Sequence, residues 1–200
     1  ISAVRLSMSV GPRGTRALIF DDDGKMVDPL PLSLRAWKTA LEQVTRRHIS
    51  NEWFRGQGGM YENMVLDIVE DRLGGAVDRE LIIATARRSL HEMLVDLEEI
   101  SAVAAIAREY HRRLPMAVAS NGSRQIVQAS LVRVGLDHLF DAMLTIDDVD
   151  KGKPAPDLFL AAARRLGVAP AHCFVFEDSR EGMTAARNAG MAFVDVATLA

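Results

Sequence analysis

The sequence predicts an α/β fold in which a parallel sheet flanked by helices is interrupted, after its first strand, by an inserted helical cap. Three observations indicate this fold. Short apolar runs recur along the chain, helical patterns separate the later runs, and one long segment contains helical patterns alone. Strands that alternate with helices are typical of a parallel sheet built with right-handed crossovers.

Five apolar runs have the length of buried strands, at 17–20, 116–119, 142–145, 173–176 and 192–196. Helical periodicity between the later runs predicts helices at 123–134, 157–166 and 181–189. We therefore expect an α/β core comprising 17–29 and 100–200, preceded by a loose N-terminal tail at 1–16.

The segment 30–99 shows no convincing strand run, only helical patterns at 34–47, 61–73 and 79–97 with glycine-rich breaks between them. A helical block of this length after the first strand predicts a cap that covers any site at the end of that strand. Trp37 lies at helical spacing from Leu34 and Leu41, which favours a place in the interior of the cap.

Composition narrows the class of protein. The 200 residues carry mixed charges with a formal net charge of −3, which gives no indication of nucleic-acid binding. No apolar stretch approaches membrane-spanning length, and the first sixteen residues lack the continuous apolar core of a secretory signal. The single cysteine, Cys173, excludes an internal disulfide and lies in an apolar run, where a buried thiol is expected. We expect a cytoplasmic protein, a monomer or weak dimer, with no membrane partner.

An acidic triplet directly follows the first apolar run and consists of Asp21, Asp22 and Asp23. Gly24 comes next and indicates the turn that ends the strand. Aspartate has low strand propensity, and clustered carboxylates repel one another unless positive charge lies among them. Alternation along an extended backbone directs Asp21 and Asp23 to one side, at the edge where α/β sheets bind ligands. The structural alternative is an acidic turn that caps the next helix.

Polar residues also follow the later predicted strands. Ser120 comes after the second, Lys153 a few residues beyond the third, and Glu177 and Asp178 after the fourth. Each alone has a structural interpretation, as a turn, a loop lysine or a helix N-cap. Together they should meet at one edge of a parallel sheet. Four carboxylates with one lysine require a cation, and oxygen donors without histidine or thiolate favour Mg²⁺.

This set of residues suits phosphoryl transfer. Ser120 and neighbouring backbone N–H groups can hold phosphate oxygens, while Lys153 neutralises phosphate charge. Asp21 is then a plausible nucleophile that forms an aspartyl-phosphate. Asp23 can protonate the leaving oxygen and later deprotonate water.

Four motifs in this order make the chain resemble the haloacid dehalogenase superfamily of phosphatases. They are the sequences FDDDG, SNG, KPAPD and FEDS at 20–24, 120–122, 153–157 and 176–179, followed by matches at 182, 185–186 and 189–191. The segments 35–38 and 115–118 make it similar to the β-phosphoglucomutase-like branch and to bacterial sugar-phosphate phosphatases of the fructose-1-phosphate type. The resemblance implies a Rossmann-like core, a small helical cap and a phosphorylated small metabolite as substrate.

The resemblance also implies residue roles. Asp21 would attack phosphorus, and Asp23 would be the acid and base. Mg²⁺ would be bound by the Asp21 carboxylate, the Asp23 backbone carbonyl and Asp178, with Glu177 in or beside that shell.

The same resemblance implies that Ser120 and Lys153 bind phosphate, with Asn121 donating a backbone N–H. Substrate choice would come from the cap, where Arg55 and Gln57 are candidates.

The chain departs from the family pattern at several positions. Lys25 follows Gly24, where a small or β-branched residue is usual. Ser33 and Gly59 stand where mutases carry a histidine and an arginine, which favours hydrolysis, although Arg55 could partly substitute. A β-phosphoglucomutase-like phosphomutase and a non-catalytic phosphate-binding or signalling module remain the alternatives. Dehalogenation at a carbon atom would not need Asp23, so the presence of this residue argues against that reaction.

Overall fold

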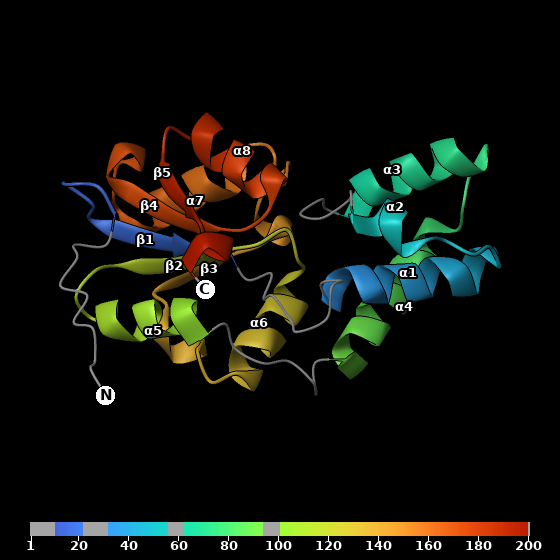
Figure 1. Cartoon of the computed structure of the whole chain (residues 1–200), viewed down its shortest axis with the longest axis horizontal. Helices are drawn as coiled ribbons and strands as arrows, with labels where there is room; N and C mark the ends of the chain where they lie inside the picture. Colours follow the sequence, from blue (N-terminus) through green and yellow to red (C-terminus); the bar gives the residue numbers. More distant parts are fainter. Residues whose placement is uncertain (1–10, 22–31, 56–61, 94–100, 200) are drawn as a thin grey trace.

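The computed structural model describes residues 11–21, 32–55, 62–93 and 101–199, and it shows a five-stranded sheet flanked by helices (Figure 1). All described strand pairs are parallel, in the order β3-β2-β1-β4-β5. The strands are β1 (Ala17–Phe20), β2 (Met116–Ala119), β3 (Ala142–Leu144), β4 (Cys173–Glu177) and β5 (Ala192–Asp195). The predicted α/β fold with a Rossmann-like parallel sheet is confirmed.

Strand β1 lies at the centre of the sheet and pairs with β2 on one side and β4 on the other. Its last residue, Phe20, stands opposite Val118 of β2 and Phe176 of β4. The carboxyl ends of these three strands therefore lie side by side. This register explains why polar groups that are far apart in the sequence meet at one edge.

Both faces of the sheet are covered by helices, which is why the strand sequences are continuously apolar. The core helices are α5 (Ser101–Tyr110), α6 (Arg124–Arg133), α7 (Asp157–Leu166) and α8 (Arg180–Asn188). Ala17 and Ile19 pack in one cluster with residues of α7 and α8. Leu18 and Phe20 point to the opposite face, where α5 packs, and α6 packs beside it against Val118.

The predicted bounds of the helices and strands agree with the observed bounds to within one or two residues, wherever the structure describes those residues. Helix α7 has the predicted bounds, while β4 extends one residue further, to Glu177. The sequence interpretation missed α5 and the five-residue helix α2 (Asn51–Arg55). Short 3-10 helices are also present at Asp137–Leu139, Ile146–Asp148, Pro170–His172 and Val196–Leu199.

Helices α1 (Leu32–Thr45), α2, α3 (Glu62–Leu73) and α4 (Arg79–Met93) are called the cap helices below. They surround an apolar cluster of their own that includes the fully buried Leu41, Leu66 and Ile82. Trp37 packs against this cluster, as predicted. The expected cap boundaries, at 29/30 and 99/100, lie outside the described residues and stay a prediction.

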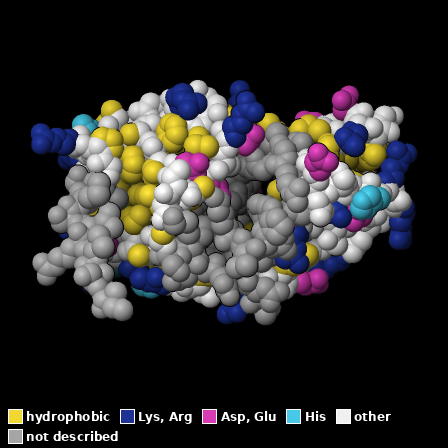
Figure 2. All heavy atoms as spheres, in the orientation of Figure 1, with side chains coloured by type: hydrophobic (Ala, Val, Ile, Leu, Met, Phe, Trp, Pro, Cys, Tyr) yellow, Lys and Arg dark blue, Asp and Glu magenta, His cyan; other side chains and the backbone are white. Residues whose placement is uncertain are grey.

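The cap helices lie beside the carboxyl-terminal edge of the sheet (Figure 1), where α4 contacts α6 of the core. Figure 2 shows a hollow between the two parts, with acidic side chains near it. The cap is therefore placed to cover a site at the strand ends. No helix in the described ranges is long and apolar enough to cross a membrane.

Residues 11–16, expected as part of a loose tail, lie against the core. The backbone N–H of Arg16 donates to the carbonyl oxygen of His172 at 2.8 Å, just before β4. The remainder of the expected tail lies outside the described residues. Cys173, the first residue of β4, is buried as predicted, and burial raises the pKa of its thiol to about 11.

Candidate active site

Lys153 forms the centre of a buried ion cluster at the carboxyl ends of the strands. Its Nζ donates to Oδ1 of Asp21 at 2.6 Å and to Oε2 of Glu177 at 2.7 Å. Asp21 directly follows β1 and Glu177 ends β4, so the pairing of these two strands brings their carboxylates to one point. Asp178 adds a third carboxylate to the same cluster.

The three ionised side chains are almost completely shielded from solvent. Lys153 retains 2% of its side-chain exposure, Asp21 5% and Glu177 none. Burial lowers the pKa of Lys153, but the two carboxylates outweigh that effect and raise its pKa above the ordinary value. The ammonium also lies 5.0 Å from the centre of the Phe159 ring, over its face. Lys153 is therefore a fixed, fully charged cation.

The side chain of Asn121 holds the backbone of Lys153. Its Oδ1 accepts from the Lys153 N–H at 2.8 Å, and its Nδ2 donates to the Lys153 carbonyl oxygen at 3.2 Å. The loop after β2 thus fixes the loop before α7. The sequence interpretation gave Asn121 only a backbone role, because nothing in the SNG motif shows what its amide faces.

Both oxygens of Glu177 are engaged by protein donors. Oε1 accepts from the Asp178 N–H, the Ser179 N–H and the Ser179 hydroxyl, each at 2.9 Å, while Oε2 accepts from Lys153. Buried carboxylates need such partners, since an unpaired buried charge is strongly destabilising. Glu177 therefore connects Lys153 to the turn between β4 and α8.

Ser120, which follows β2, is buried in the loop that also carries Asn121. Its Oγ accepts from the N–H of Gly122 at 3.0 Å, and its backbone N–H donates to the carbonyl of Leu144 in β3. These bonds orient the side chain, and a serine hydroxyl that accepts one hydrogen bond can also donate one. This is the arrangement required of a group that binds an anionic oxygen.

Asp21, Glu177 and Asp178 each offer a carboxylate oxygen, and these three atoms lie within 4.8 Å of one another. Three carboxylates against one ammonium leave an excess of negative charge. Oxygen donors alone, with this charge, fit a hard divalent cation. Of the four carboxylates predicted to meet at this edge, these three lie together in the described part of the chain, while Asp23 lies outside it.

Several predicted residues fall outside the described part of the chain. These are Asp23, Lys25, Gln57 and the side chain of Arg55, whose backbone ends α2. Arg87 of α4 forms a bidentate ion pair with Glu62 of α3, with both contacts at 2.9 Å. It therefore links two cap helices.

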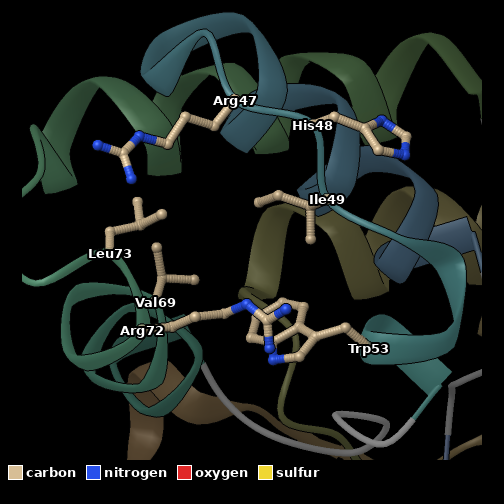
Figure 3. A pocket seen from close by; sticks show the side chains of 7 residues that line it. All are labelled: Arg47, His48, Ile49, Trp53, Val69, Arg72 and Leu73. Atoms are coloured by element: carbon tan, nitrogen blue, oxygen red, sulfur yellow. The ribbon is translucent and has the colours of Figure 1, made fainter.

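The cap contains a separate cavity of about 250 Å³ between α3 and the segment that joins α1 to α2 (Figure 3). Arg47 and Ile49 face it from one side and Val69 from another, while the guanidinium of Arg72 extends over the Trp53 ring, 5.7 Å from its centre. None of the residues lining this cavity belongs to the ion cluster. The two sites are distinct.

Residues 18–196 match the family of haloacid dehalogenase-like hydrolases. The chain is 35% identical over 182 residues to the fructose-1-phosphate phosphatase of Escherichia coli (strain K12), covering 91% of this chain and 96% of the relative. It is 28% identical over 193 residues to the beta-phosphoglucomutase of Bacillus subtilis (strain 168), covering 90% and 83%.

A crystal structure of a hydrolase from Pseudomonas syringae shares the fold, with a TM-score of 0.80 at 24% identity over 90% of this chain and 83% of that one. The resemblance seen in the four sequence motifs, and with it the expected class of hydrolase, is confirmed. The chain belongs to the haloacid dehalogenase-like hydrolases.

Proposed function

We propose that the chain is a Mg²⁺-dependent phosphatase that hydrolyses small phosphorylated metabolites, sugar phosphates above all, through an aspartyl-phosphate on Asp21. The observation that carries this proposal is the contact of Lys153 with Asp21 at the strand ends. It places a buried carboxylate and a permanent cation together where a phosphate would be held. The names of the two relatives, a fructose-1-phosphate phosphatase and a beta-phosphoglucomutase, support a phosphorylated sugar as substrate.

In the first step, an oxygen of Asp21 attacks phosphorus, and the bond between phosphorus and the sugar oxygen breaks. The electron pair of that bond goes to the sugar oxygen, which takes a proton from Asp23 in the proposed role of general acid. Lys153 and the Ser120 hydroxyl hold the phosphate oxygens as negative charge redistributes. The products are the free sugar and an acyl-phosphate on Asp21.

In the second step, water attacks the phosphorus of the aspartyl-phosphate while Asp23, now a carboxylate, accepts its proton. The bond between phosphorus and Asp21 breaks, which regenerates the carboxylate and releases inorganic phosphate. Its two carboxylate partners raise the pKa of Lys153 in the resting site, and Glu177 with the anionic phosphoryl group would keep it protonated while Asp21 carries the phosphate. It therefore acts as a fixed charge in both steps.

Asp21 and Asp178 are the proposed carboxylate ligands of Mg²⁺, with the Asp23 backbone carbonyl completing the protein ligands. Bound there, the ion would reduce the repulsion between the attacking carboxylate and the phosphate. We place Glu177 beside this shell, because Lys153 and the turn 178–179 engage its oxygens.

Specificity is assigned to the cap, with Arg55 and Gln57 as the proposed substrate contacts. Cap closure would exclude bulk water while the phosphoenzyme forms. We further propose a cytoplasmic location and a monomer or weak dimer, with no nucleic-acid or membrane partner.

The test is release of inorganic phosphate from a panel of hexose and pentose phosphates, with Mg²⁺ or with EDTA. Metal-dependent release from sugar phosphates is the expected result. Conversion of one sugar phosphate into its isomer, without release and with a requirement for a bisphosphate, would establish a mutase instead. Absence of both activities would overturn the proposal in favour of a phosphate-binding module.

A further inference from the structure

Gly182 lies in the first turn of α8, directly against the Glu177 side chain. A Cβ atom built at position 182 would lie 1.9 Å from Oε2 of Glu177, 2.0 Å from its Cδ and 2.6 Å from its Cγ. These separations are far below contact distance. Since glycine is a poor helix former, its place inside a helix calls for a packing reason, and the Glu177 carboxylate supplies one.

The Glu177 carboxylate cannot move aside without losing its partners. It is completely buried, and it accepts four hydrogen bonds, one from Lys153 and three from residues 178 and 179. A displaced carboxylate would leave these donors unsatisfied in the interior, which is costly. Any atom added at Gly182 therefore acts on the ion cluster.

Gly182 is also linked to Glu177 through its backbone. Its N–H donates to Oγ of Ser179 at 2.9 Å, and the Ser179 hydroxyl donates to Oε1 of Glu177 at 2.9 Å. Ser179 is the N-cap of α8, so the start of this helix is fixed by the same group that holds the carboxylate. Two independent contacts thus place Glu177 relative to α8.

We infer that Gly182 is a positioning residue for the phosphoryl-transfer site: the absence of a side chain at this position leaves room for the Glu177 carboxylate, which holds the Lys153 ammonium beside Asp21. The inference about geometry stands on the contacts alone, and its catalytic consequence rests on the proposed function.

Thermal stability tests the geometry without reference to activity. We expect Gly182→Ala to lower the Tm in the wild-type chain and in Glu177→Gln, because glutamine keeps the shape of glutamate. In Glu177→Ala, the same substitution should leave the Tm unchanged or raise it, since the obstructing atoms are gone and alanine favours a helix. Gly75→Ala, which adds a methyl group with no atom within 4 Å, is the control. Its effect on the Tm should be the same whichever residue stands at position 177.

An equal loss of Tm in all three backgrounds would show that Gly182 acts through general helix packing and would overturn the inference. A crystal structure of Gly182→Ala gives a second test that does not require Glu177→Ala to fold. The distance from Lys153 Nζ to Glu177 Oε2 is expected to exceed hydrogen-bond range. Retention of the contact would refute the inference.

The catalytic consequence is tested by phosphate release and by inhibition with inorganic phosphate. A misplaced ammonium should lower kcat by roughly 10²-fold and weaken phosphate inhibition, as expected for a small displacement at a reacting centre. Wild-type kcat and phosphate inhibition in a folded Gly182→Ala variant would overturn the positioning role. If the wild-type chain itself releases no phosphate, the proposed function fails, while the Tm cycle still decides the geometry.

Discussion

The ammonium of Lys153 lies 2.6 Å from Oδ1 of Asp21, although 132 positions separate the two residues in the sequence. Their contact depends on the sheet order, because β1 pairs with β2 and β4, and the loop leading to α7 reaches over those strand ends. It also depends on Asn121, which holds the Lys153 backbone. Each part of this arrangement can be tested separately.

Asp21→Asn should keep the fold and abolish turnover. Asparagine has nearly the same shape, but its amide does not attack phosphorus to form an acyl-phosphate. Loss of a nucleophile reduces kcat by several orders of magnitude, so we expect a decrease of more than about 10³-fold. Phosphate release measures the effect, with Asp137→Asn, an exposed aspartate in a 3-10 helix, as the control. Full activity in Asp21→Asn would exclude the proposed mechanism.

Lys153→Met should destabilise the fold as well as remove activity. Methionine fills similar space but leaves Asp21 and Glu177 as buried carboxylates without their cation. Removing one partner of a buried ion pair costs about 3–5 kcal/mol, and we expect a decrease of this size in the free energy of unfolding in urea. Lys151→Met, an exposed lysine on the same loop, is the matched control. Equal stability of the two variants would contradict the role assigned to the cluster.

Mg²⁺ should stabilise the folded chain, because a ligand that binds only the native state raises its stability. We expect a higher Tm with Mg²⁺ than with EDTA, and loss of most of this difference in Asp178→Asn. Asp150→Asn removes an exposed carboxylate on the loop before Lys153 and should keep the Tm difference between Mg²⁺ and EDTA. A Tm that is insensitive to Mg²⁺ in the wild-type chain would argue against the proposed metal site.

Much of the fold could be predicted because the sheet is parallel and buried on both faces, which gives short, continuous apolar strands such as 17–20. The same topology made the meeting of Asp21, Lys153 and Glu177 predictable from their positions after strands. Helix α5 was missed because it begins at the expected boundary between cap and core, so it does not lie between two of the predicted strands.

Side-chain contacts between loops could not be predicted in this way. The amide of Asn121 contacts the backbone of Lys153, and the ring of Phe159 lies beneath the Lys153 ammonium. Neither contact follows from the periodic pattern of apolar residues that predicts helices and strands. Glu177 was expected in or beside a metal shell, and only the structure shows its four protein donors. Gly182 is unusual in the sequence because it is a glycine within a predicted helix, and the structure gives the reason, since the Glu177 side chain packs against it.

Two cap helices are joined by an ion pair that should depend on pH, in which Glu70 of α3 pairs with Arg79 at the start of α4. Hydrogen bonds from the Arg79 guanidinium and from the Val77 N–H lower the pKa of Glu70 from 4.5 to about 2. A carboxyl whose pKa is lower in the folded state contributes stability above its ordinary pKa, and this contribution is lost as the pH falls through the folded value. Glu70 should therefore stabilise the cap at neutral pH and lose that effect between about pH 4.5 and 2.

The chain has two tryptophans, Trp37 and Trp53, and both lie in the cap helices, so tryptophan fluorescence reports on unfolding of this part. Glu70→Gln should unfold at lower urea concentration than the wild-type chain at pH 7, and the difference should narrow as the pH falls from 4.5 towards 2. Asp71→Asn, at the neighbouring exposed position on α3, should show no comparable change at pH 7. A difference for Glu70→Gln that is constant across this pH range would show that the side chain acts through packing, since a packing contribution does not depend on ionisation of the carboxyl.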